Sequence, residues 1–298
     1  MPSKHQLDRL AIGLMVVFCT IWGIQQVAIK LANVGISPVW QAGLRSLGAV
    51  VLVWAWAGLR GVKLFERDGS LWPGLLAGLL FACEFALLYW ALEYTTASRG
   101  VIFLYTAPFV VAVGAVWLLP HEHMRRAQWM GMALAFVGVL ALFGENLLQP
   151  SGLAWLGDLM MFAAAVFWAA TTLTVKASAL GRVAPEKTLI YQLGVSALVL
   201  PLVAQLLGEP GVFAPTPMVW ASLAFQTVVV AAASYLGWFW LIRHYPATRL
   251  SSFSFLTPVL GVVAGGLLLG EPLTPAVFIA LGLVGLGIWV ANRTVASA

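Results

Sequence analysis

Residues 22–30 read WGIQQVAIK and residues 168–176 read WAATTLTVK, so a tryptophan and a lysine recur with the same spacing of eight. The first copy is followed by Gly48, Arg99, Pro108 and Glu122, and the second by Gly194, Arg249, Pro258 and Glu271. In both copies the glycine stands eighteen residues after the lysine, and the arginine stands nine residues before the proline. We therefore predict that the chain is an internal duplication.

The composition is that of a membrane protein. Apolar residues make up 61% of the 298 residues and charged residues 9%, whereas about a quarter of the residues in soluble domains are charged. So few polar residues would not cover a soluble core of this size. The formal net charge of +5 fits lysines and arginines on cytoplasmic loops. We therefore expect the lipid bilayer as a partner, and no nucleic acid.

Ten segments have the roughly 20 mainly apolar residues that a transmembrane helix needs. They are 10–30, 38–58, 72–92, 98–119, 127–144, 153–175, 187–207, 218–241, 250–269 and 275–292. The first five form a repeat within residues 1–146, and the last five a second repeat within 153–292. Because five is odd, the second repeat enters the membrane from the opposite side. The predicted fold is an all-α membrane protein of ten transmembrane helices in two inverted five-helix repeats.

The basic residues predict how the chain is oriented. If the N-terminus is inside, thirteen lysines and arginines fall on the inner side, and the outer side receives Lys30 and Arg99. Cytoplasmic loops carry the excess of positive charge in membrane proteins. We therefore predict that both termini are cytoplasmic.

Two charged residues lie well inside predicted spans, Arg45 in the second and Glu84 in the third. Their similar depth on adjacent helices allows them to meet, and an unpaired charge at that depth is costly. One interpretation is a structural ion pair. The other is that both side chains face a substrate pathway and hold opposite ends of a zwitterion. Glu84 is also the candidate carboxylate for proton coupling.

Two prolines, Pro108 and Pro258, fall near the middle of their spans. Each lacks an amide hydrogen and pushes away the carbonyl four residues earlier, at Leu104 and Ser254. Such carbonyls are tolerated in a membrane where protein or a water-filled cavity satisfies them. The prolines therefore predict either kinks that take part in gating, or kinks healed by a nearby hydroxyl.

Four spans carry aromatic and polar side chains on one face. These residues are Trp22, Gln25 and Gln26 in span one, Trp168, Thr171 and Thr172 in span six, Ser234, Tyr235 and Trp238 in span eight, and Ser252 and Phe255 in span nine. Singly, each also fits helix packing, because hydroxyls and amides join membrane helices. As a set, they predict a mixed aromatic and polar cavity that binds a small molecule.

The spans hold no catalytic or metal-binding pattern. An intramembrane enzyme would need paired aspartates, a zinc helix or a nucleophile elbow, and the sequence of the spans has none of them. The run His121-Glu122-His123 lacks the i, i+4 pairing of a zinc helix. We therefore predict that the protein is not an enzyme and has no catalytic residue, cofactor or metal site.

The sequence resembles a known family, the EamA-type carriers of the drug/metabolite transporter superfamily. The stretches that carry the resemblance are Trp22 to Lys30, Gly35 to Pro38 and Arg45, Gly157 to Trp168, Pro108 to Gly138, and Pro258 through Gly270-Glu271 to Gly287. Within the superfamily the chain looks most like the YddG-type aromatic amino-acid exporters. One departure is that Tyr191 stands in the second copy where the first has Arg45, so the predicted pocket is not symmetric.

The resemblance implies a secondary transporter that works by alternating access in the bacterial plasma (inner) membrane, as a monomer or homodimer. One charge of each sign, with aromatic and hydroxyl groups, suits a small amphipathic zwitterion. Aromatic or neutral amino acids therefore fit best, and export is the direction that the family implies. The alternative is an efflux carrier for lipophilic cations and other drugs.

Overall fold

The computed structural model describes residues 7–91, 94–119, 122, 124–148, 152–270 and 273–292. Within these residues the regular structure is helical, apart from one isolated bridge between Ile36 and Val212. Ten helical stretches of the described chain are long and apolar enough to cross a membrane. The predicted all-α fold with ten spans is therefore confirmed, while the inverted arrangement of the repeats and the side on which the termini lie stay predictions.

Seven spans are single helices: α1 (Arg9–Ala32), α2 (Pro38–Leu59), α3 (Leu71–Ala91), α6 (Arg126–Phe143), α7 (Ala154–Ala177), α8 (Pro185–Leu206) and α13 (Pro275–Asn292). Three are composite: α4 (Ala97–Leu104) with α5 (Ala107–Leu118), α9 (Pro217–Phe225) with the π-helix η3 (Gln226–Ser234) and α10 (Tyr235–His244), and α11 (Ala247–Phe253) with α12 (Leu256–Leu269). Short 3-10 helices, η1 (Gly144–Leu148) and η2 (Ala179–Gly181), lie in two connections. All limits of the spans lie within three residues of the predicted ones.

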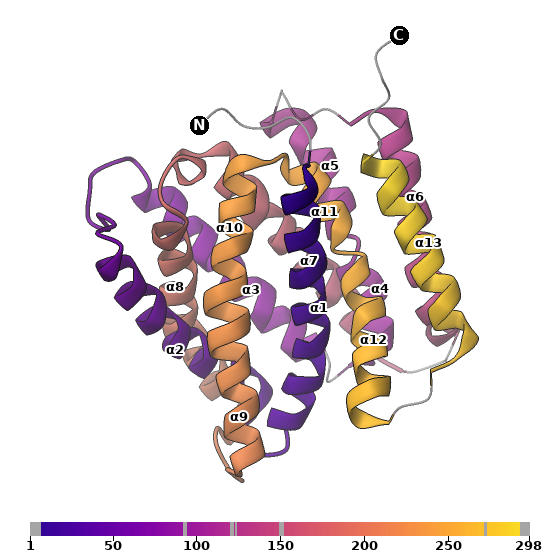
Figure 1. Cartoon of the computed structure of the whole chain (residues 1–298). Coiled ribbons are helices and arrows are strands. Elements are labelled where there is room, and N and C mark those ends of the chain that lie inside the picture. Colours follow the sequence, from indigo (N-terminus) through magenta and orange to yellow (C-terminus); the bar gives the residue numbers. More distant parts are fainter. Residues whose placement is uncertain are drawn as a thin grey trace.

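The spans run between two faces of the bundle, and Figure 1 shows that α1 begins and α13 ends at the same face. We call this the termini face and the other the opposite face. α1 packs on α12 and on the span of α9, η3 and α10, while α7 packs on α4 and α5 and on α3. α2 packs on α8, and α6 on α13. Span by span, each of these contacts has a counterpart in the other half of the chain.

Acidic residues in two loops join the halves at the two faces. At the termini face, Lys187 in the first turn of α8 donates a 2.8 Å hydrogen bond to Asp68 in the loop after α2. At the opposite face, Glu209 in the loop after α8 accepts from the amides of Val39 and Trp40 in the first turn of α2, at 3.1 and 3.0 Å. The hydrogen bond from Lys187 lowers the pKa of Asp68 to about 2, so Asp68 stays ionised at neutral pH.

The spans that contain Pro108 and Pro258 are both interrupted just before the proline. α4 ends at Leu104, and Pro108 is the second residue of α5. α11 ends at Phe253, and Pro258 is the third residue of α12. Each predicted proline thus follows a short helix break, and the predicted part of the two prolines in gating stays a prediction. Proline fits the first turn of a new helix because the amides there need no helical partner.

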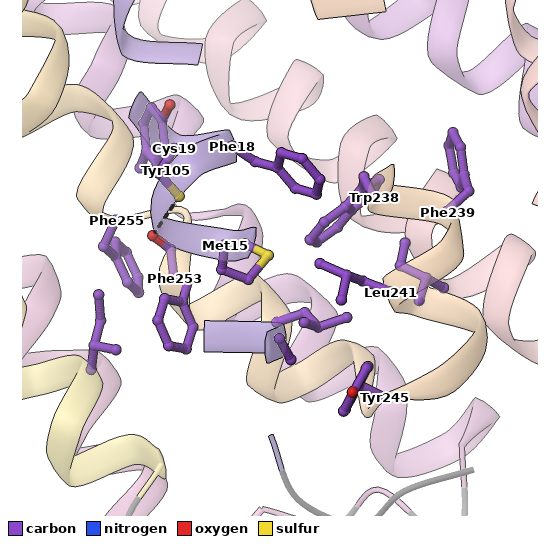
Figure 2. Close-up of a cluster of buried hydrophobic side chains, with 14 of the residues drawn as sticks. Met15, Phe18, Cys19, Tyr105, Trp238, Phe239, Leu241, Tyr245, Phe253 and Phe255 are labelled. Atoms are coloured by element: carbon purple, nitrogen blue, oxygen red, sulfur yellow. Dashed lines mark hydrogen bonds between the residues drawn. The ribbon is translucent and has the colours of Figure 1, made fainter. Parts of the chain in front are cut away.

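Side chains bond the carbonyls at both breaks. At the first, the hydroxyl of Thr106 donates to the carbonyl of Phe103 (2.6 Å). At the second, the hydroxyl of Ser254 bonds a carbonyl three residues earlier (2.6 Å), and the thiol of Cys19 on α1 donates to the carbonyl of Phe253 (3.3 Å; Figure 2). Backbone carbonyls in hydrocarbon need such partners within the protein. At the first break a hydroxyl therefore does bond a carbonyl, but it is that of Phe103 and not the predicted one of Leu104.

A testable consequence concerns the contact between α6 and α13. A Cβ on Gly287 would lie 2.5 Å from the carbonyl oxygen of Gly131, so we expect Gly287→Ala to push the helices apart. Overpacking of this kind costs about 1–3 kcal/mol. The melting temperature of the purified protein in detergent should fall by several degrees. Gly282→Ala on the same helix, where a Cβ meets nothing within 4 Å, is the matched control and should leave it unchanged. Equal melting temperatures for the two variants would contradict this packing.

Candidate functional site

A chamber with a volume of about 130 Å³ lies in the middle of the bundle, among α1, α3, α7 and α10. Nine residues that the sequence predicted for a cavity line it: Trp22, Gln25, Gln26, Glu84, Trp168, Thr171, Thr172, Tyr235 and Trp238. Since a water molecule needs about 10–15 Å³ of such space, the chamber holds several waters or a small organic group. The structure thus brings the polar and aromatic stripes of spans one, six and eight together.

The sequence analysis missed part of the chamber wall. Phe81, Phe85, Tyr105, Gln192, Phe239 and Thr257 also line it. A signal for the two phenylalanines was present, because Phe81, Glu84 and Phe85 follow the i, i+3, i+4 spacing of one helix face. No comparable pattern marks Gln192, whose neighbours in span seven include no other polar residue of the predicted cavity.

The aromatic rings of the chamber meet largely edge to face. The ring of Trp22 lies 5.7 Å from that of Trp238, at an angle of 79°. Tyr105 and Trp168 meet at 5.8 Å and 89°. The indole of Trp22 donates a 2.9 Å hydrogen bond to Ser234, the last residue of the π-helix, and this bond fixes the ring. Glu84 is the one acidic or basic side chain among the residues that line the chamber.

Three other predicted cavity residues lie behind the wall. Ser234 is buried beneath Trp22 and also donates to a carbonyl of η3. Ser252 donates to a carbonyl of α11 and accepts from Asn292 of α13. Phe255 is fully buried, with its ring 5.8 Å from that of Phe109. The break after Phe253 ends the regular helix on which the predicted face of span nine depended.

Arg45 and Glu84 are both buried but do not form the ion pair that one interpretation predicted. No carboxylate oxygen of the described chain lies within 4.0 Å of the Arg45 guanidinium, and its three nitrogens have no hydrogen-bond partner there. The guanidinium carbon instead lies 4.5 Å from the centre of the Phe85 ring. Because Phe85 lines the chamber and Arg45 does not, Arg45 lies just behind the wall. A buried charge without a partner costs about 3–5 kcal/mol.

A vestibule of about 600 Å³ continues the chamber toward the opposite face. It shares Gln25, Phe85 and Tyr105 with the chamber and extends to Lys30 and Asn33 at the far end of α1. Pro258 lines the vestibule, whereas Pro108 is buried within α5 and lines neither space. The two prolines are therefore not equivalent in this structure.

The vestibule side also carries a buried ion pair that the sequence analysis missed. Arg99 of α4 binds Asp158 in the second turn of α7, with a shortest distance of 2.7 Å, and Thr95 donates to the same carboxylate. A further 3.0 Å hydrogen bond joins Arg99 to the carbonyl of Leu147. These contacts tie span four to span six at the opposite face.

The termini face is closed by a network of Asp8, Glu122, Lys176, Tyr245 and Thr248. The Lys176 ammonium donates to the carbonyls of Ile242 and Tyr245, each at 2.7 Å, and lies 3.5 Å from Glu122. Glu122 accepts from the amide of Thr248, and the Tyr245 hydroxyl donates to Asp8 (2.9 Å). The network joins α1, α7, the α10–α11 corner and the connection between α5 and α6.

An apolar plug separates this network from the chamber. Figure 2 shows Met15 of α1 between Phe253 and Leu241, with Tyr245 farther away, just past the end of α10. Met15 and Leu241 have no exposed surface, and Phe253 has 4%. The chamber therefore adjoins the vestibule, while buried apolar side chains lie between the chamber and the termini face.

A bundle of ten spans whose polar and aromatic chamber reaches one face and is closed toward the other has the architecture of a membrane transporter. The sequence profile of the EamA-like transporter family matches residues 9–144 and 155–293, and the chain belongs to this family. The predicted family is thereby confirmed.

Similar proteins agree with this assignment. The uncharacterized transporter YoaV of Bacillus subtilis is 25% identical over 92% of this chain and 94% of its own length. The uncharacterized inner membrane transporter YedA of Escherichia coli is 24% identical over 91% of this chain and 87% of its own. A protein of known crystal structure shares the fold, with a TM-score of 0.82 and 19% identity over 96% of this chain and 97% of that one.

The network at the termini face makes a second prediction. Lys176→Met removes the donor of two 2.7 Å bonds, so the closed arrangement should lose stability relative to an arrangement open at this face. Charge-assisted bonds of this kind are worth about a tenfold shift or more. We expect a cysteine placed at buried Thr248 to react about tenfold faster with an impermeant maleimide in the Lys176→Met background.

The control is Lys63→Met, which removes the exposed ion pair of Lys63 with Glu66 at the same face. It should leave the labelling rate unchanged. Applying the maleimide from each side of membrane vesicles also tests the predicted cytoplasmic location of this face. Equal rates in the Lys176→Met and parent backgrounds would contradict a closing role for the network.

Proposed function

We propose that the protein is a secondary transporter that exports small amphipathic metabolites, with aromatic or neutral amino acids as its substrates. The observation that carries this proposal is the chamber, where Glu84 stands among aromatic faces and the amides of Gln25 and Gln192. Aromatic faces attract both apolar rings and ammonium groups, and a carboxylate pairs with an ammonium. This substrate class agrees with the resemblance to the YddG-type aromatic amino-acid exporters.

We infer that transport proceeds by alternating access between two inverted repeats. The reciprocal packing of the spans supports this inference, since α1 lies on α12 as α7 lies on α4 and α5. The loop contacts of Asp68 and Glu209 support it too, because each carboxylate docks on the first turn of the second helix of the other half. Inverted repeats place a central site between two gates that open in turn.

We further propose that the protein works in the bacterial plasma (inner) membrane with both termini in the cytoplasm. The excess of basic residues at the termini face supports this orientation. In that frame the vestibule faces outward, and the network around Lys176 is the closed inner gate. We propose that the unit is a monomer or a homodimer, with the outer sides of α6 and α13 as the surface for a dimer contact.

A second candidate function is the efflux of lipophilic cations. One observation favours it: Glu84 lines the chamber, whereas Arg45 lies behind the wall. A chamber with a carboxylate and aromatic faces binds organic cations without needing a positive partner. The two functions differ in whether the substrate carries a carboxylate.

The test is uptake into proteoliposomes of labelled L-phenylalanine and of tetraphenylphosphonium, with and without a pH gradient. We expect uptake of the amino acid, faster when the gradient drives proton exchange. Uptake of the cation alone would favour the second function, and uptake of neither would exclude both substrate classes.

The same assay tests proton coupling through Glu84. Glu84→Gln keeps the shape of the side chain but removes the exchangeable proton, so acceleration by the pH gradient should disappear. Glu145→Gln, at an exposed residue of η1, is the matched control and should behave like the parent protein. Gradient-driven uptake that survives in Glu84→Gln would rule out this carboxylate as the coupling group.

A further inference from the structure

The most unusual group in the described chain is the Arg45 guanidinium. Its side chain has no exposed surface, and none of its three nitrogens has a hydrogen-bond partner among the residues that the structure describes. Two other largely buried basic groups of the spans are held differently: Arg99 by Asp158, and Lys176 by two carbonyls and Glu122. Within the described chain, Arg45 is therefore a buried cation that no hydrogen bond or close ion pair holds.

The ring of Phe85 separates Arg45 from the chamber. Phe85 lines both the chamber and the vestibule, and the guanidinium carbon lies 4.5 Å from the centre of its ring. Two aromatic neighbours flank it one turn away on α3, with ring centres at 4.8 Å for Phe81 and 6.3 Å for Tyr89. Rotation of this one side chain would bring Arg45 into contact with the contents of the chamber.

Glu84 lies next to Phe85 and lines the chamber with most of its surface buried. Arg45 interacts with it electrostatically, although the two charged groups are more than 4.0 Å apart. Two opposite charges that are close but not joined leave a gap that a zwitterion can bridge. An α-amino acid carries its ammonium and carboxylate on one carbon, so its two groups would satisfy both side chains.

We propose that Arg45 is a carboxylate subsite covered by Phe85, and that Phe85 is a specificity-determining residue. The substrate carboxylate displaces the Phe85 ring and accepts paired hydrogen bonds from the Arg45 guanidinium, while Glu84 binds the substrate ammonium. This inference rests on the proposed transport of amino acids and adds how the site selects them. Compounds without a carboxylate leave the ring in place and bind through Glu84 and the aromatic faces alone.

The test is the binding of two matched probes to the purified protein, followed by tryptophan fluorescence. The probes are L-phenylalanine and phenethylamine, which differ by the carboxylate. We expect the parent protein to bind L-phenylalanine at least about tenfold more tightly, as charge-assisted bonds imply. Arg45→Gln should abolish this preference and change the affinity for phenethylamine less than twofold. Arg45→Lys, which keeps the charge but lacks the planar fork, should retain part of the preference.

Phe85→Leu tests separately whether the Phe85 ring covers Arg45, and this test remains decisive if Arg45→Gln does not fold. Removal of the ring should raise the affinity for L-phenylalanine and leave that for phenethylamine nearly unchanged. In the double variant with Arg45→Gln, this gain should vanish, because the ring then covers no charge. Equal effects of Phe85→Leu on both probes would overturn the proposal.

Further outcomes separate this inference from the proposed function. Binding of both probes without preference in the parent protein would overturn the carboxylate subsite and leave a transporter of amines. Binding of neither would overturn the subsite together with the proposed substrate class. A titration with sodium chloride completes the set: Arg45-dependent binding of chloride without any preference for L-phenylalanine would overturn a substrate carboxylate in favour of a free anion.

Discussion

The requirement that every backbone carbonyl in hydrocarbon finds a partner within the protein governs this structure. It makes the spans helical, and it allows a helix to break only where another group takes over the lost bond. Thr106 does so before Pro108, and Ser254 and Cys19 do so before Pro258. Both breaks lie near the chamber, because Tyr105 and Thr257 stand beside them and line it. The two helix breaks, where backbone hydrogen bonds of the helix are lost, therefore lie next to the chamber.

The charged side chains inside the bundle likewise need partners within the protein. Arg99 and Lys176 both lie near a face, and both reach a carboxylate and at least one carbonyl of another element. These pairs hold spans together across the two halves, so they stabilise one arrangement of the halves over another. Arg45 departs from the rule, since its guanidinium meets a ring instead of an anion. A buried charge without a close partner is well suited to bind a ligand of opposite charge. Its desolvation is already part of the free energy of folding, so pairing with the ligand favours binding.

The spans and most residues of the chamber wall could be predicted from the sequence. The length of each apolar run, and the spacing and depth of polar and aromatic side chains within it, follow directly from the order of residues. Trp22, Glu84 and Trp168 line the chamber as predicted. Phe255 does not, because a break in span nine ends the helical face on which the prediction rested. The pairing of Arg99 with Asp158 and of Lys176 with Glu122 joins residues far apart in the chain, and no local pattern reveals it. The cover of Phe85 over Arg45 depends on the orientation of one ring, which sequence does not determine.

The proposed duplication would account for the asymmetry of the cavity better than two independent halves would. Lys30 and Lys176 occupy matching places in the repeated sequence, yet Lys176 lies in the closed network and Lys30 lines the vestibule. In the proposed alternating cycle the two lysines would exchange these roles, since an inverted repeat brings each to the opposite face. Arg45 and Glu84 have no such exchange, because Tyr191 stands where a second arginine would be. The gates can thus be shared between the halves while the binding groups belong to one of them, which keeps the substrate in the same chemical surroundings whichever gate is open.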